Sequence, residues 1–64
     1  MADYAGRLKR LLRQAGCRLE RQGKGDHEIW YSPITEQRFP VDNKIKSQPT
    51  ANGILKQAGL DKAF

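Results

Sequence analysis

Two segments near opposite ends of the chain have almost the same sequence, and each has the features of a helix end. Leu-Arg-Gln-Ala-Gly-Cys at 12–17 matches Leu-Lys-Gln-Ala-Gly-Leu at 55–60. In each segment the glycine, Gly16 or Gly59, can take the left-handed conformation that closes a helix, and the next apolar residue can pack back on the leucine. The match is much shorter than a repeat unit, so it indicates one capping solution used twice.

An apolar stripe leads into each of these glycines and predicts an amphipathic helix. The first stripe has helical spacing and comprises Tyr4, Leu8, Leu11, Leu12 and Ala15. The second comprises Ala51, Ile54, Leu55 and Ala58. Asp3 is a candidate N-cap for the first helix. Ser47 or Gln48 can begin the second, with Pro49 in its first turn, although Gly53 inside it costs about 1 kcal/mol relative to alanine.

Three short runs between the predicted helices are typical of β-strands. Residues 17–22 alternate apolar and polar side chains, which predicts a half-buried strand with Cys17 and Leu19 facing inward. Residues 28–32 are rich in β-branched and aromatic side chains, and residues 37–41 place Phe39 and Val41 on one face. Pro40 lacks a backbone donor, so the third strand should lie at a sheet edge or end there.

One face of an antiparallel sheet can cover both apolar stripes. This predicts an α+β fold in the order α-β-β-β-α, with a three-stranded antiparallel sheet and two helices on one face. Residues 1–64 are enough for a single domain with a small core, because a chain of about 60 residues buries only about 60% of its unfolded surface.

Composition narrows the function classes further. A single cysteine excludes an intramolecular disulfide and a multi-cysteine zinc site. Apolar runs are too short for a membrane span, and charges interrupt any signal-peptide core, so the cytoplasm is the expected location.

The net charge of +5 and the pI of about 9.8 favour binding to a polyanion or to an acidic partner protein. Four cations off the first stripe predict a basic outer helix face: Arg7, Lys9, Arg10 and Arg13.

The densest turn signal stands at Gly23-Lys24-Gly25-Asp26, directly before the only histidine, His27. A histidine side chain titrates near neutral pH, so a position between a rigid strand and an open turn suits proton transfer. Composition alone also allows His27 to be structural or merely exposed. Asp26, His27 and Glu28 do not suggest a metal site, because neighbouring residues on a strand point to opposite faces. We therefore expect no metal and no other cofactor.

The same stretch resembles the HicA-type mRNA interferase toxins, whose motif is a glycine-rich turn, Gly-Ser-His and a short aromatic strand. Here it reads Gly25-Asp26-His27, followed by Glu-Ile-Trp-Tyr-Ser-Pro at 28–33, and residues 54–59 resemble the closing helix of the family. The resemblance covers nearly the whole chain. Asp26 departs from the serine of the motif, and its carboxylate would repel phosphate or cap its own turn.

The resemblance implies a double-stranded-RNA-binding-domain-like fold, cleavage of mRNA with His27 as general acid or base, and a HicB-type antitoxin. RNA supplies its own nucleophile, the 2′-hydroxyl, so cleavage does not require a metal. With one histidine, a water, a lysine or a carboxylate must make the other proton transfer. The alternatives are a non-catalytic RNA-binding domain and a protein-interaction module for an acidic partner.

Several residues are candidates for contacts with RNA. Lys24 is a mobile point charge suited to phosphate. Gly23 and Gly25 allow close approach of a phosphate or serve only the turn. Further candidates for phosphate contact are Arg38 and Lys44. Trp30 and Tyr31 point to opposite sheet faces, so one should fill the core and the other should stack on a base or pack against a partner. The sequence leaves open which one is exposed.

Overall fold

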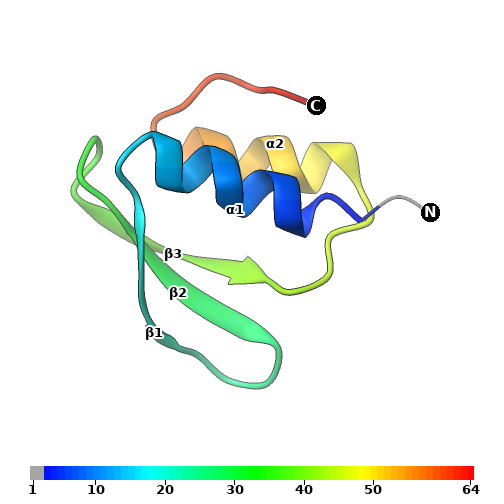
Figure 1. The fold of residues 1–64 in the computed structure, drawn as a ribbon, viewed down its shortest axis with the longest axis horizontal. Coiled ribbons are helices and arrows are strands. Elements are labelled where there is room, and N and C mark those ends of the chain that lie inside the picture. Colours follow the sequence, from blue (N-terminus) through cyan, green and yellow to red (C-terminus); the bar gives the residue numbers. More distant parts are fainter. Residues whose placement is uncertain (1–2) are drawn as a thin grey trace.

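The computed structural model describes residues 3–64, which form two helices and three strands in the predicted order. The elements are α1 (Ala5–Gln14), β1 (Arg18–Gln22), β2 (His27–Ser32), β3 (Gln37–Asp42) and α2 (Gln48–Gln57). The strands form one antiparallel sheet in the order β1-β2-β3. The two helices lie side by side over one face of the sheet (Figure 1). The predicted α+β fold is confirmed.

The matching segments end the two helices in the same way. Gly16 and Gly59 have φ values of +95° and +84°. The N–H of Cys17 donates to the carbonyl of Leu12 at 2.9 Å, and the N–H of Leu60 donates to that of Leu55 at 2.8 Å. These are the long hydrogen bonds of a Schellman motif, so the shared capping solution is confirmed.

Helix starts differ slightly from the prediction. The N-cap of α1 is Tyr4, one residue later than expected, but Oδ1 of Asp3 still accepts the N–H of Ala5 at 3.0 Å. The same oxygen accepts the N–H of Ile45 at 3.3 Å, and these two bonds lower the pKa of Asp3. In α2, Ser47 is the N-cap and Pro49 lies in the first turn, as predicted.

The core lies between the sheet and the helices. Trp30, Phe39 and Val41 enter it from β2 and β3, and their largest helical neighbours are Leu8, Leu12 and Leu55. Ser32 is also buried, and its hydroxyl donates to the carbonyl of Ala58 at 2.7 Å. This bond ties the end of β2 to the end of α2 and satisfies a carbonyl that the helix leaves unpaired.

The prediction of a half-buried first strand is wrong. All five residues of β1 are exposed, including Leu19 at 46%, and the buried Cys17 precedes the strand. The pairing of β1 with β2 shifts between Leu19 and Arg21, which breaks the alternation. In addition, α2 packs on β3 and α1 packs on α2, so the edge formed by β1 has little helix above it.

The predicted basic outer face of α1 is correct for three of its four members. Arg7, Arg10 and Arg13 are exposed. Lys9 instead turns inward, where its ammonium group lies 3.0 Å from Oε1 of Glu28 and 2.7 Å from Oδ1 of Asn43. Oε1 of Glu28 also accepts the indole N–H of Trp30, at 3.0 Å. These bonds, first from the indole and then from Lys9, lower the pKa of Glu28.

Candidate active site at the ends of two strands

The backbone N–H and the backbone carbonyl of His27 both form hydrogen bonds with residues of the glycine-rich turn. The N–H of Gly23 donates to the carbonyl of His27 at 2.9 Å, and the N–H of His27 donates to the carbonyl of Lys24 at 3.1 Å. A Cβ on Gly23 would lie 3.2 Å from that His27 oxygen, and Gly25 has a φ of +60°. Both glycines therefore serve turn geometry, which fixes the position of the histidine. Contact of either with phosphate stays a prediction.

Strand register brings Asp42 next to the imidazole ring. His27, the first residue of β2, pairs with Asp42, the last residue of β3, and Nδ1 of the ring contacts Oδ1 of the carboxylate. The two side chains are 54% and 42% exposed. Because an ionised carboxylate only accepts hydrogen bonds, the contact assigns a proton to Nδ1 and leaves Nε2 available to a ligand.

A pocket of about 310 Å³ lies beside this pair. We call it the α2 pocket, and its lining comes from β2, β3 and one face of α2: His27, Pro40, Asp42, Thr50, Gly53, Ile54 and Gln57. Pro40 and Ile54 provide apolar surface, whereas Thr50 and Gln57 provide a hydroxyl and an amide. A ligand in the α2 pocket would touch the His27–Asp42 pair directly.

Burial shows which of the two aromatic side chains, Trp30 or Tyr31, is the more exposed. Trp30 is fully buried, so it cannot stack on a base, whereas Tyr31 is half-buried on the opposite sheet face. The guanidinium carbons of Arg18 and Arg38 lie 5.0 and 5.5 Å from the centre of the Tyr31 ring. A hydrogen bond with Glu20 holds Arg38, which raises the pKa of Arg38 and lowers that of Glu20.

The other predicted site residues divide into two locations. Lys24 is exposed in the turn beside His27, and Lys44 is exposed two residues after Asp42, so both lie close in sequence to the pair. Arg38 and Tyr31 face each other four residues farther along β3 and β2. The structure thus places a turn cluster of His27 and Lys24 at one end of the strands and an aromatic cluster toward the other.

The sequence analysis missed Asp42, Thr50 and Gln57. A signal for Asp42 was present, since the turn at 33–36 makes Ser32 and Gln37 partners, and counting back along both strands puts Asp42 opposite His27. For Thr50 and Gln57 the signal was weaker. They share a helix face with Ile54, but nothing in the spacing says that this face lies near the histidine.

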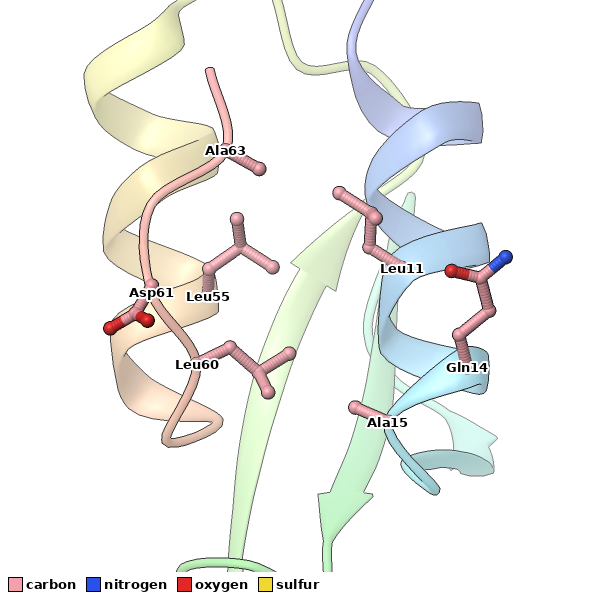
Figure 2. A pocket seen from close by; sticks show the side chains of 7 residues that line it. All are labelled: Leu11, Gln14, Ala15, Leu55, Leu60, Asp61 and Ala63. Carbon is pink, nitrogen blue, oxygen red and sulfur yellow. The ribbon is translucent and has the colours of Figure 1, made fainter.

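A second pocket, of about 330 Å³, lies on the other side of the helix layer and is mainly apolar. Figure 2 shows leucine side chains from both helices and the C-terminal segment converging on it. Its lining comprises Leu11, Gln14, Ala15, Leu55, Leu60, Asp61 and Ala63. With one carboxylate and no cation in its lining, this pocket is poorly suited to a phosphodiester.

Within residues 3–64, the His, Cys, Asp and Glu side chains form no group of three that could hold a metal ion. Neither helix in that part of the chain is long and apolar enough to cross a membrane.

Comparison with known families shows which family the chain belongs to. The model of a family described as the HicA toxin of bacterial toxin–antitoxin matches residues 6–60, which is most of the chain. The chain belongs to the HicA toxin family. It is therefore the toxin of a toxin–antitoxin system, in a family of ribonuclease toxins that implies a cognate antitoxin. Neither the curated proteins nor the solved structures give a significant match.

Proposed function

We propose that this HicA toxin cleaves mRNA and that His27 moves the protons at the scissile phosphodiester. The observation that supports the proposal most directly is the contact between Nδ1 of His27 and Asp42 at the wall of a pocket. A base held by a carboxylate, with its second nitrogen open to a ligand, is the arrangement that general base catalysis uses.

The proposed reaction uses the substrate's own nucleophile. Nε2 of His27 accepts the proton of the 2′-hydroxyl, and the 2′-oxygen forms a bond to phosphorus. The bond from phosphorus to the 5′-oxygen breaks, and a proton from water completes the 5′-hydroxyl of the leaving strand. The hydroxide that remains takes the proton from Nε2, which returns His27 to its starting state. The other product ends in a 2′,3′-cyclic phosphate. Charge on the phosphorane is offset by Lys24, the cation in the same turn as His27.

Replacing the imidazole tests this assignment. His27→Ala should abolish RNA cleavage while leaving the circular dichroism spectrum and the melting temperature unchanged, because the side chain is 54% exposed and lies outside the core. A folded alanine variant that cuts RNA at the wild-type rate would end the assignment.

The chemistry of the product tests the mechanism separately. Cleavage should continue in EDTA, and the 3′ ends of the products should carry a 2′,3′-cyclic or 3′ phosphate. Activity that disappears in EDTA and returns with magnesium or manganese would contradict the metal-independent mechanism. A wild-type chain that binds RNA without cutting it would favour the non-catalytic alternative.

A further inference from the structure

Gly53 lies inside α2, and packing gives no reason for a glycine there. A Cβ built on Gly53 would meet nothing within 4 Å among the described residues, whereas one on Gly59 would meet Ile34 at 2.7 Å. Glycine in the middle of a helix is destabilising relative to alanine, and Gly53 does not have the positive φ that would require it. The fold would therefore accept a larger residue at this position and gain stability from it.

The position of Gly53 on the wall of the α2 pocket gives a reason for a glycine there. The residues of α2 that line the α2 pocket are Thr50, Gly53, Ile54 and Gln57. Their spacing of i, i+3, i+4 and i+7 defines one helix face, with Gly53 between the hydroxyl and the amide. A side chain at 53 would project from the middle of this face. The absent side chain keeps the pocket beside His27 open.

The chemistry of the lining indicates what could enter. Pro40 and Ile54 offer apolar contact, as a flat ring requires, and the amide of Gln57 can both donate and accept hydrogen bonds. The volume of about 310 Å³ is at the lower end of the range for ligand sites. Protein pockets that take in an unstacked nucleobase combine aromatic or apolar side chains against its faces with hydrogen bonds to its edge.

We propose that the α2 pocket binds one nucleobase of the RNA, adjacent to the phosphate that His27 acts on, and that Gly53 is retained to admit it. This inference rests on the proposed function, because RNA is taken as the substrate. It adds a site that determines which base stands next to the cleaved bond. The wall shared with the His27–Asp42 pair favours a substrate base over the side chain of a partner protein.

Filling the pocket tests the inference through cleavage. Gly53→Leu should lower the cleavage rate at least tenfold and change the base preference beside the cut, and Gly53→Ala should raise the melting temperature by a few degrees while lowering cleavage less. Gly6 gives a matched control, because a Cβ there also meets nothing within 4 Å in the described chain and α1 does not line the pocket. Gly6→Leu should cleave as the wild type does.

Gly53 also borders another pocket, of about 380 Å³, between α2 and the C-terminal segment, and Thr50 does not line that pocket. Thr50→Leu should therefore reproduce the loss of cleavage if the α2 pocket is responsible. Wild-type cleavage with unchanged base preference in both Gly53→Leu and Thr50→Leu would overturn the inference. Normal cleavage combined with loss of antitoxin binding would also overturn it and would assign the pocket to a protein side chain.

A binding measurement keeps this result separate from the proposed function. The four nucleoside 3′-monophosphates contain no phosphodiester bond, so the toxin cannot cleave them. Each can be titrated into the wild-type chain while amide chemical shifts are followed. One base should shift residues 50–57 most strongly, and Gly53→Leu, but not Gly6→Leu, should lose the effect. Failure of the wild type to cut any RNA would refute the proposed function while leaving this measurement valid. The inference fails if none of the four nucleotides shifts residues 50–57.

Discussion

The carboxylate of Asp42 determines which nitrogen of His27 faces a ligand. Its contact with Nδ1 orients the ring, so in the proposed reaction the 2′-hydroxyl of the RNA would meet Nε2. In the proposed reaction Asp42 would act through the imidazole, as a positioning residue. Its position at the end of β3 depends on strand register and so on the whole β2–β3 hairpin.

Asp42→Asn tests the positioning role. An asparagine amide can donate to Nδ1 and so favour the wrong tautomer, and we expect kcat to fall at least about tenfold with little change in KM. Steady-state kinetics on a short RNA measures both constants. Asp42→Glu, which restores a carboxylate, should recover part of the loss.

The control for Asp42→Asn is Asp26→Asn. It makes the same change of charge one residue from His27. There the Asp26 carbonyl accepts a backbone hydrogen bond from the N–H of Asn43, the residue after β3, at 3.1 Å. Cleavage by Asp26→Asn should match or exceed that of the wild type, since a charge that repels phosphate is removed. Equal losses in the two variants would refute the positioning role.

Glu28 links stability to pH. Hydrogen bonds from Trp30 and Lys9 lower its pKa in the folded chain, so the stabilisation is complete above the unfolded value of 4.5 and is lost as pH falls through the lower folded value. Glu28→Gln should therefore cost about 1 kcal/mol at pH 7. Thermal melts should show a smaller difference between variant and wild type at pH 3. A difference that does not shrink on acidification would contradict this account.

At the level of single residues, the sequence predicts His27 and Lys24 as neighbours in one turn but does not reveal the partner of His27. The identity of the exposed aromatic residue also depends on register, because the alternation of β2 becomes loose where the strand meets the turn. The structure begins β2 at His27, so Tyr31 shares the face of His27, and Trp30 points to the core. Two ambiguities thus have one cause, the exact start of a strand.

At the level of elements, the helices follow local rules and the first strand does not. The glycine caps, Ser47, Pro49 and the apolar stripes predict both helices because each signal acts within a turn or two of its neighbours. The burial of β1 depends instead on where distant helices lie. The alternation in residues 17–22 indicates which side chains share a face of the strand. It does not indicate whether another element covers that face.

The two helix-closing glycines predict unequal costs of substitution. Both have positive φ, so either alanine variant should lose about 1 kcal/mol from backbone strain. At Gly16 the new Cβ would meet Pro33 at an ordinary 3.5 Å, whereas at Gly59 it would meet Ile34 at 2.7 Å and Thr35 at 2.9 Å. Gly59→Ala should therefore lose a further ~1–3 kcal/mol.

Urea unfolding of the two alanine variants measures this difference, and the wild type provides the common reference. Gly59→Ala should have the lower midpoint because Gly59 packs against the β2–β3 turn as well as ending α2. Equal midpoints would show that the turn moves aside at little cost.

At the level of the whole molecule, the charge of +5 and the exposed turn cluster are open to any acidic partner. We expect the antitoxin to silence the toxin by covering His27 and the turn at 23–26, with acidic groups in place of phosphate near Lys24. Tyr31 is the available aromatic anchor, since Trp30 is buried. The association rate should fall with salt, because such charges steer the encounter.

Hydrogen exchange tests occlusion in the complex. Amides of residues 23–31 should exchange more slowly with antitoxin bound than in the free toxin, and residues 5–10 of α1 provide an internal comparison. Unchanged exchange across 23–31 would mean that silencing acts from a different surface.

The two outer strands of the sheet, β1 and β3, have a consequence for self-association. Each outer strand of the sheet presents unpaired backbone groups, which can pair with a second copy of the chain. In β3, Pro40 removes a donor from the outer edge. In β1, the irregular pairing near Glu20 and the arginines on either side of it disturb and charge the other edge. The features that make β1 a poor core strand should therefore keep the toxin from polymerising at high concentration.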